Sequence, residues 1–557
     1  MRAEPPGQAQ GQSAGKGNMN RIRQVRRLWE TVRHLKPIQI YGRIGYRLRR
    51  PRAANAVAVR RRDASGHWAE TFAGPPSLVG PTEFLLLNEV RQLDPGGWDD
   101  ASVPRLWRYN LHYFSDLTAI DNALRADWHQ SLLRRWVAEN APGVGTGWEP
   151  YPTSLRIVNW IKWALTGHAL DADVEASLAI QLDWLTRRLE HHLLGNHLFS
   201  NAKALVYGGL YFEGPDADRW LRIGLGILRR ELAEQVLPDG GHFERSPMYH
   251  ALAIEDVLDL INIDQAFADR AGLAAQLRPT AQRMLRWLQS MSHPDGEIGF
   301  FNDAAFGIAP SLDALSAYAT RLGLTLPRAE AAPLVHLRDS GYLRVSFGDC
   351  VALIDVAPVG PDYQPGHAHA DTLSFELSVA GRRVFVNSGT SEYGLSPERL
   401  RQRGTAAHNT LIVGALNSSD VWSGFRVGRR AHPTGMTLHQ EADLVRVACS
   451  HDGYQPTLGL IHTRTWTFTP GRLVIQDQLS RSGPTSEARF HLHPDIAAIA
   501  PELLPLASGK TMHVSTTGAD AMTLAASTWH PRFGQSIPSK VLAVQISGGT
   551  ATTTFAW

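Results

Sequence analysis

The spacing of the apolar residues changes once along this chain, and that change limits what the chain can fold into. Between about residues 100 and 330 the apolar residues recur every three or four positions, which is typical of amphipathic helices. Later stretches such as 351–356 and 461–468 are short, β-branched or alternating, and bounded by Gly, Pro or Asp, which predicts strands. The sequence therefore predicts a helical domain followed by an antiparallel β-sandwich.

The helical part reads as successive helix–loop–helix pairs. Their connections carry Gly and Pro, and no fixed-period repeat is present. More than two hundred residues of such pairs predict a helical toroid or solenoid. The stretches with the clearest helical pattern are 155–167, 174–190, 221–236, 251–268 and 278–291.

Three regions follow from this pattern. Residues 1–20 are rich in Gly, Gln and Ala and lack the apolar core of a signal peptide, so we expect a disordered tail. Residues 21–330 form the expected helical domain and residues 331–557 the expected β-sandwich domain, joined by a linker at 326–333. Without a signal peptide, the cytoplasm is the default location, with the periplasm as the alternative.

Composition narrows the class of protein. A chain of 557 residues is too long for one ordinary core. A formal net charge of +3 argues against a nucleic-acid binder but leaves room for a basic cleft and an acidic substrate. Two cysteines, Cys350 and Cys449, are too few for a disulfide framework. No apolar run reaches the ~20 residues of a transmembrane segment, and the oligomeric state stays open.

The segment 20–62 is rich in arginine. Its first apolar residues, Ile22, Val25, Trp29 and Val32 among them, fall at helical spacing. Such a basic helix could touch a membrane surface or a polyanion. We expect it instead to dock on its own domain with a solvated basic face.

The stretch 365–377 carries the strongest chemical signal. His367, His369 and Asp371 lie two residues apart, so an extended backbone would place all three on one face. From Leu373 apolar and polar residues alternate, which predicts a half-buried strand. Two imidazoles and a carboxylate on one face can bind a divalent metal or transfer protons. The alternative is a surface strand with incidental histidines, but the preceding Gly turn favours a site.

Three further clusters combine a turn with chemistry. At 195–205 two asparagines and a histidine open an apolar helix, where a single asparagine would be an ordinary N-cap. At 239–250 a glycine turn precedes His, Glu, Arg, Tyr and His, which turn chemistry alone does not explain. At 401–410 a glycine turn is followed by a histidine that enters a strand.

Taken in order, these motifs resemble the heparinase II/III family of polysaccharide lyases. The resemblance runs from the basic helix at 32–41 to about residue 495. It implies an incomplete (α/α) toroid followed by an antiparallel β-sandwich, and β-elimination at a uronic acid within an acidic polysaccharide. The motifs are Asn-His at 196–197 with Asn201, Ser-Pro-Met-Tyr-His at 246–250, His-Ala-His-Ala-Asp at 367–371, and Arg-Gly-Thr-Ala-Ala-His-Asn-Thr at 403–410 with Ser418, Ser419 and Trp422.

Elimination at a uronate needs three kinds of group. One neutralises the carboxylate so that the C5 proton becomes acidic, a base removes that proton, and an acid protonates the leaving oxygen at C4. By resemblance, Asn196 with His197 is expected at the carboxylate, Tyr249 as the acid with a second role as base, and His367 as the other proton-transfer group. A tyrosine acts as a base where a neighbouring cation lowers its pKa.

Other residues are expected to contact the polysaccharide. Arg245 and His250 are adjacent to the key tyrosine motif and are second choices for its chemistry. The expected substrate-binding residues are Arg245, His250, Glu244, Trp148 and Arg403.

The resemblance also implies a divalent metal, zinc or calcium. Family members draw ligands from the second histidine of the His-x-His stretch, an acid on the next strand and the later histidine. The matching positions are His369, Asn387 and His408. Asn387 stands where an aspartate is expected, which weakens a zinc site, although oxygen-preferring ions accept amide carbonyls. We expect any such metal to organise the β-domain side of the cleft.

Two other functions remain open at this stage. A glycoside hydrolase would need two carboxylates across a cleft, for which Glu149, Asp239 and Glu244 are candidates. A non-catalytic polysaccharide-binding protein of exopolysaccharide metabolism would need aromatic residues such as Trp148 without the proton-transfer groups. The particular polysaccharide is not readable from one sequence.

Overall fold

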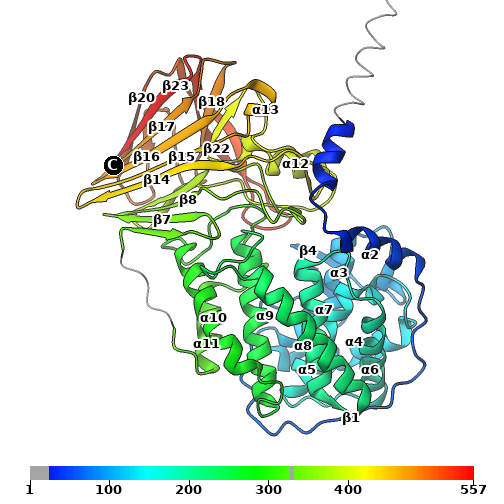
Figure 1. Cartoon of the computed structure of the whole chain (residues 1–557). Helices are drawn as coiled ribbons and strands as arrows, with labels where there is room; N and C mark the ends of the chain where they lie inside the picture. The colour runs from blue at the N-terminus through cyan, green and yellow to red at the C-terminus, as the bar shows by residue number, and fades with distance from the viewer. Residues whose placement is uncertain (1–23, 327–331) are drawn as a thin grey trace, which may run out of the picture.

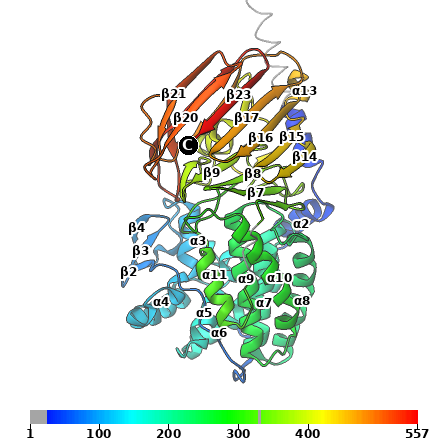
Figure 2. The same ribbon diagram turned by 90° about the vertical axis from the view of Figure 1, so that its left-hand side faces the viewer.

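The structure, a computed structural model, describes residues 24–326 and 332–557. It consists of a helical domain joined end-on to a β-rich domain (Figures 1 and 2). The last helix of the helical domain ends at Arg321 and the first strand of the β domain begins at Leu334. The predicted tail at 1–20 and the predicted boundary near 330 fall outside the described residues. The predicted fold, a toroid of helices followed by an antiparallel sandwich, is confirmed.

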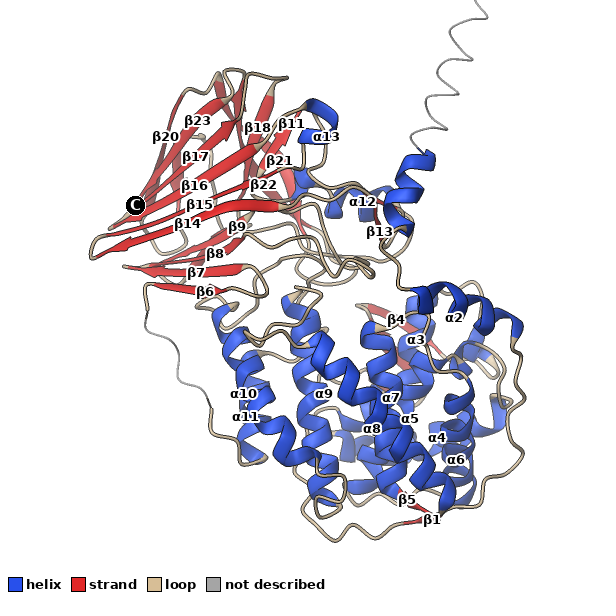
Figure 3. Cartoon of the chain, in the orientation of Figure 1, coloured by secondary structure: helices blue, strands red, loops and turns tan. Residues whose placement is uncertain are grey.

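The helical domain is an incomplete (α/α) toroid with small strands at its margins (Figure 3). Its helices are α2 (Pro37–Leu48), α3 (Arg105–Tyr113), α4 (Ala126–Glu139), α5 (Pro150–Leu165), α6 (Ala172–Arg187), α7 (Gly195–Tyr211), α8 (Pro215–Gln235), α9 (Pro247–Ala266), α10 (Leu273–Ser290) and α11 (Leu312–Arg321). Its strands are β1 (Arg60–Arg61), β2 (Leu78–Gly80), β3 (Glu83–Leu86), β4 (Glu89–Gln92) and β5 (Phe212–Glu213).

Helix α7 is the centre of the toroid. Almost all of its residues are buried, and it packs on α5, α6, α8 and α9, as a helix that is enclosed on all sides does. Gly208 permits the close approach of α6, because a Cβ at this position would lie 2.3 Å from the side chain of Leu182. The N-terminal end of α7 meets the β domain, where Gly195 lies against Gln364.

The β domain is built from three large antiparallel sheets and the two-stranded sheet β12-β13. The strand orders of the large sheets are β10-β9-β8-β7-β6, β14-β15-β16-β17-β23-β20-β19 and β11-β18-β22-β21. Both cysteines are buried and free. The strands are β6 (Leu334–Leu337), β7 (Tyr342–Phe347), β8 (Cys350–Asp355), β9 (Phe375–Val379), β10 (Arg382–Phe385), β11 (Leu411–Val413), β12 (Val421–Trp422), β13 (Arg426–Val427), β14 (Pro433–Glu441), β15 (Leu444–His451), β16 (His462–Thr469), β17 (Arg472–Leu479), β18 (Ser486–His491), β19 (Leu503–Pro505), β20 (Thr511–Thr517), β21 (Ala521–Trp529), β22 (Ile537–Ile546) and β23 (Thr550–Ala556), with two short helices, α12 (Pro397–Arg403) and α13 (Gln455–Leu458).

The burial of strand β9 differs from its prediction. The alternating pattern predicted a half-buried strand, but every residue of β9 is buried. Its apolar side chains enter the sandwich core. On its other face, Glu376 and Ser378 form hydrogen bonds with the imidazole of His293 in the helical domain, at 2.9 and 2.8 Å. The polar face is therefore an interdomain face. The segment 365–371, expected to be extended, is a series of turns.

The arginine-rich segment also differs from its prediction. It forms a helix at 24–32 and helix α2. The guanidinium of Arg27 donates to the carboxylate of Asp420 at 2.7 and 2.8 Å, and Gln39 donates to a backbone carbonyl of the β domain. Both helices thus dock by polar side chains and leave apolar ones exposed, Trp29 among them. The expected solvated basic face is present, since Arg43 and Arg47 are exposed, but the first helix docks on the β domain and not on the helical domain.

A buried ion pair braces the β-domain side of the seam. Arg464 of β16 donates to both carboxylate oxygens of Asp477, at 2.7 and 2.9 Å, and to the backbone carbonyls of Leu373 and Asn409. Against the effect of burial, Arg464 and His462 hold the pKa of Asp477 well below its usual range. The guanidinium therefore ties two loops to the sheet.

Replacing Arg464 by Met should destabilise the β domain, because it leaves the buried carboxylate of Asp477 without its partner. We expect the free energy of unfolding to fall by about 3–5 kcal/mol, the usual effect of breaking a buried pair. Urea unfolding followed by tryptophan fluorescence measures the change. The matched variant Arg472→Met, at an exposed position of β17, should change by less than about 0.5 kcal/mol. Equal unfolding midpoints for the two variants would contradict the bracing role.

Candidate active site

The predicted chemical residues meet at the seam between the domains. Asn196 and His197 lie in the first turn of α7, and Tyr249 lies in the first turn of α9. His367 belongs to the irregular segment 361–372 that leads into β9. The rings of Tyr249 and His367 face each other at a tilt of 31°, with centroids 3.9 Å apart. A side chain of the toroid thus contacts a side chain of the β domain, as expected for an interdomain site.

The start of α9 fixes Tyr249. The hydroxyl of Ser246 caps the helix by accepting from the backbone N–H of Tyr249 at 3.2 Å, and Pro247 supplies the first helical position. The phenol oxygen lies 2.9 Å from that of Tyr393. Burial, with the neighbouring Tyr393 and Asp303, raises the pKa of Tyr249 well above its ordinary value. Because the expected lowering of this pKa is absent, the geometry favours Tyr249 as a proton donor.

A buried carboxylate, Asp303, organises the site. It accepts hydrogen bonds from Nδ1 of His367 and Nε2 of His369, both at 2.8 Å. The guanidinium of Arg399 donates to both of its oxygens, one of them at 2.7 Å. Burial opposes ionisation, but Arg399 and the two imidazoles hold the pKa of Asp303 well below its usual range.

The charge on Asp303 sets the tautomer of His367. A carboxylate only accepts hydrogen bonds, so Nδ1 of His367 carries the proton and Nε2 keeps a lone pair. Nε2 makes no hydrogen bond to any residue in the described parts of the chain. This is the arrangement in which an acid–histidine pair presents a base to a substrate.

Sequence reasoning missed three of these residues: Asp303, Tyr393 and Arg399. Asp303 carried a readable signal, because Asn-Asp is the one polar pair in the otherwise apolar stretch 298–306. Tyr393 and Arg399 lie in and after a loop of mixed composition, and nothing in their spacing distinguishes them. Their role depends on the tertiary arrangement alone.

The first turn of α7 supplies an amide and an imidazole. Oδ1 of Asn196 is buried without a hydrogen-bond partner in the described structure, and Asn196 lines a cavity with Tyr249. Nδ1 of His197 lies 3.1 Å from Glu190. Burial disfavours the imidazolium, but the carboxylate of Glu190 outweighs it and raises the pKa of His197. Asn201, in contrast, is fully buried and bonds to Glu190, which is a structural role.

Several buried polar atoms at the seam have no partner among the described residues. They include both carboxylate oxygens of Glu244, Oε1 of Gln364 and the hydroxyl of Tyr363. Burial raises the pKa of Glu244, while His367 and His197 act against that effect. Buried polar groups are normally hydrogen-bonded to protein or to ordered water.

Three predicted substrate contacts are buried and hydrogen-bonded to other parts of the protein. His250 is fully buried, and its two ring nitrogens bond to backbone groups at 3.1 and 2.9 Å. Trp148 is buried in the aromatic core of the toroid, and its indole N–H donates to a backbone carbonyl. Arg403 is buried and donates to the carbonyl of Ala368, so it holds the histidine segment from behind. Residue type alone predicts each of these three contacts, but in the structure each side chain supports the packing of its neighbours.

Arg245 has a comparable supporting role. Its Nε donates to the carbonyl of Ser340 at 3.0 Å, and its guanidinium packs on Gly360, where a Cβ would lie 1.8 Å from Nη1. The side chain therefore joins the helical domain to the β domain. Of the expected substrate-binding residues, Glu244 alone has both side-chain oxygens without a partner among the described residues.

A second feature lies behind Tyr249 and His367. One ligand atom from each of His369, Asp371 and His408 lies within 4.8 Å of the others, and all three residues are buried. Nδ1 of His369 is 3.1 Å from Nε2 of His408. These nitrogens therefore point at a common position, as predicted.

The hydrogen bonds of these histidines leave two lone pairs facing each other. His408 donates from Nδ1 to the carbonyl of Gly404 at 2.9 Å, and His369 donates from Nε2 to Asp303. Burial lowers the pKa of both rings, to about 4 for His408, so both are neutral at pH 7. Two neutral imidazole nitrogens and a carboxylate are the ligand types of a transition-metal site.

The third member of this cluster is Asp371, where the resemblance indicated Asn387. The amide of Asn387 is fully engaged elsewhere: its oxygen accepts from the backbone N–H of Asn409 at 3.0 Å, and its nitrogen donates to the carbonyl of Phe300 at 2.9 Å. Sequence reasoning had singled out Asp371 within the His-Ala-His-Ala-Asp stretch but had not grouped it with His408.

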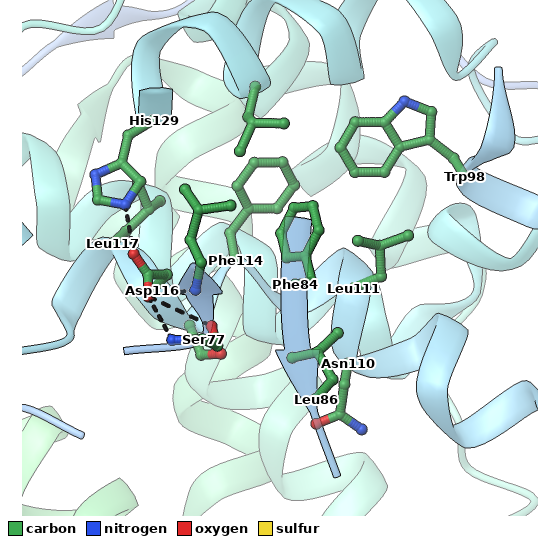
Figure 4. A pocket seen from close by; sticks show the side chains of 13 residues that line it. Ser77, Phe84, Leu86, Trp98, Asn110, Leu111, Phe114, Asp116, Leu117 and His129 are labelled. Carbon is green, nitrogen blue, oxygen red and sulfur yellow. Dashed lines mark hydrogen bonds and ion pairs between the residues drawn. The ribbon is translucent and has the colours of Figure 1, made fainter. Parts of the chain in front are cut away.

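A separate cavity in the toroid is a packing feature. It lies against β2 and β3 and is lined mainly by apolar side chains such as Phe84 and Trp98 (Figure 4). Its one carboxylate, Asp116, already accepts from His129, Arg125 and two backbone amides. Although burial opposes ionisation, these bonds lower the pKa of Asp116 to about 2. Nothing here supplies a proton donor and acceptor pair.

Comparison with known proteins agrees with this geometry. The family model of the heparinase II/III N-terminus matches residues 146–319, and the model of the heparinase II/III-like C-terminal region matches residues 329–557. Heparin-sulfate lyase of Bacteroides stercoris is 27% identical over 246 residues, which are 40% of this chain and 36% of that protein. The match thus spans about a third of that lyase.

Two further comparisons extend over more of the chain. FtsZ-localized protein C of Caulobacter vibrioides is 26% identical over 459 residues, 73% of each chain. The crystal structure of heparinase III superposes with a TM-score of 0.68 at 18% identity, covering 84% of this chain and 80% of that one. The two family models together cover most of the chain and include the whole proposed site, and the protein belongs to the heparinase II/III family.

Proposed function

We propose that the protein is a polysaccharide lyase that cleaves an acidic, uronate-containing polysaccharide by β-elimination. The observation that carries the proposal is the contact between Tyr249 and His367 across the domain seam, with Asp303 behind the histidine. One ring is a protonated donor and the other presents a lone pair. Both therefore reach a single sugar ring in the required protonation states.

The reaction assigns a role to each group. The amide of Asn196 and the imidazolium of His197 neutralise the uronate carboxylate, which makes the C5 proton more acidic. Nε2 of His367 removes that proton, and the electron pair forms the C4–C5 double bond. The C4–O bond breaks as the hydroxyl of Tyr249 donates its proton to the leaving oxygen. Proton exchange with solvent restores His367 and Tyr249.

The hydrolase alternative finds less support. Hydrolysis needs two carboxylates across the cleft, but Asp239 is bonded to the backbone N–H and hydroxyl of Ser340, and Glu149 is paired with Arg105. Glu244 is the one candidate with free oxygens. A non-catalytic role is the second candidate, because FtsZ-localized protein C is named for its location and matches 73% of the chain. A measurable elimination product decides between these functions.

We also propose that His369, Asp371 and His408 hold one divalent ion. Two imidazoles and one carboxylate fit zinc better than calcium, which prefers oxygen ligands. When bound, the ion would neutralise the buried carboxylate of Asp371 and fix the two loops that carry the histidines. Its place behind Asp303 makes the role structural, and no catalytic step depends on it.

Tyr249→Phe should lower turnover by about a hundredfold or more, because it removes only the proton donated to the leaving oxygen. His367→Asn should act similarly by removing the base. The measurement is ultraviolet absorbance of the unsaturated uronate, on a panel that includes heparan sulfate, hyaluronan, alginate and bacterial exopolysaccharides. Tyr41→Phe, which removes an exposed hydroxyl on α2, is the control and should keep parental activity. A folded Tyr249→Phe enzyme with the parental rate would remove tyrosine from the mechanism.

Chelator-treated protein should take up about one zinc ion per chain, and the uptake should raise its melting temperature, because binding to the folded state alone stabilises it. His408→Ala should lose both effects, whereas His432→Ala, at an exposed histidine, should keep them. Metal analysis after dialysis and a thermal melt measure the two readouts. Unchanged zinc uptake by His408→Ala would rule out this ligand set.

A further inference from the structure

The two N-terminal helices present an apolar stripe to solvent. Eight of the 23 large apolar side chains exposed in the described residues fall within 25–48. Trp29 is 65% exposed and Ile44 is 55% exposed. The full set is Val25, Leu28, Trp29, Val32, Ile40, Tyr41, Ile44 and Leu48. Concentration of this kind on one segment is unusual for a surface that only water contacts.

The stripe lies opposite the docked face of each helix. At about 100° per residue, Val25, Trp29 and Val32 share one side of the first helix, whereas Arg27 and Thr31 lie on the other. Arg27 bonds to Asp420, and Thr31 accepts from the indole N–H of Trp422. The polar side of this helix therefore faces the β domain, and the apolar side points away from it.

Helix α2 repeats the arrangement. Ile40, Ile44 and Leu48 share its outer side, while Gln39 is buried and donates to the backbone of the β domain. On its inner side Gly42 lies against His192. Both helices lie one after the other on the same side of the molecule (Figures 1 and 3).

Cationic side chains accompany the stripe. Residues 24–52 contain nine basic residues and one acidic residue, Glu30, which is paired with Arg26. Several of the arginines are exposed next to the apolar side chains, including Arg43 and Arg47. Arginine can keep its charge in water while its stem lies along an apolar surface. Apolar and aromatic residues between exposed arginines are typical of helices that lie in the headgroup region of a membrane.

We propose that these two helices adsorb the protein to an anionic lipid bilayer, lying parallel to its surface. No helix within the described residues has the length and apolar character to cross a bilayer, so the attachment is interfacial. A polyanionic polysaccharide would pair with the arginines but leave the apolar stripe in water. A second copy would bury the stripe but bring the two arginine sets together at a two-fold interface. An anionic bilayer satisfies both kinds of side chain.

Vesicle sedimentation of the full chain tests the proposal. We expect the protein to sediment with vesicles of phosphatidylcholine and phosphatidylglycerol, and much less with vesicles of phosphatidylcholine alone. Added salt should weaken the binding, because it screens the arginines. A protein that does not sediment with the anionic vesicles overturns the proposal.

Paired variants separate the stripe from general surface apolarity. The double variant Trp29→Ser, Ile44→Ser should bind anionic vesicles at least about tenfold more weakly, because two large side chains no longer leave water. Arg43→Gln, Arg47→Gln should lose part of the preference for anionic lipid. The control double variant Leu124→Ser, Ile499→Ser removes two other exposed apolar side chains, 84% and 90% exposed, and should bind as the parent does. Thermal melts establish that all variants are folded.

Two other results would overturn the proposal. If the Trp29, Ile44 variant binds vesicles as the parent does, the stripe is not the contact surface. If sedimentation velocity shows a dimer that this variant dissociates, while vesicle binding is absent, the stripe joins two copies. Retention of the parent on immobilised heparin without vesicle binding would assign the arginines to polysaccharide instead.

Discussion

The ionised carboxylate of Asp303 is the interaction on which the site depends. A buried charge is unfavourable unless it is paired and hydrogen-bonded, and here Arg399 and two imidazoles, all from the β domain, supply the partners. Asp303 belongs to the helical domain side of the seam, so satisfying its charge requires the two domains to be in contact. Its backbone also bonds to the site, donating to the carbonyl of His367 and accepting from Ser246. The candidate site and the domain interface are therefore one hydrogen-bonded network.

This dependence explains why the seam is polar. Glu376 on β9 accepts from His293 and from the backbone of Phe300, and Arg245 reaches the backbone of Ser340. Such bonds are directional, and they fix the distance between the toroid and the sandwich more closely than apolar contact does. A reaction that needs a base from one domain and an acid from the other needs that accuracy. The unpaired oxygens of Glu244 lie in this seam together with other buried polar atoms that have no partner among the described residues, such as Oδ1 of Asn196 and Oε1 of Gln364.

Helices and strands can be predicted from this sequence, but the groups that their polar side chains contact cannot. Periodicity located helices α5, α6, α8, α9 and α10 and several of the strands between β8 and β17, because local spacing records which side of an element is apolar. The motifs located Tyr249, His367 and Asn196 at the seam. Periodicity does not record what a polar side faces, so β9 was predicted to be half-solvated. Residue type does not record whether a side-chain nitrogen is already hydrogen-bonded, so it predicts substrate contacts at His250 and Arg403. Asp303 was missed because its importance comes from three residues distant in sequence.

The same reasoning accounts for the outward apolar face of the N-terminal helices. The loop that precedes His367 exposes a backbone carbonyl at Tyr363 and is bonded to Arg430 through Asp362. A helix that covers such a surface must present donors, and Gln39 of α2 does so. An amphipathic helix has one polar side, and using it for docking leaves the apolar side in solvent. Because the docking surface is polar, the helices turn their polar sides toward it, and the apolar stripe therefore faces solvent.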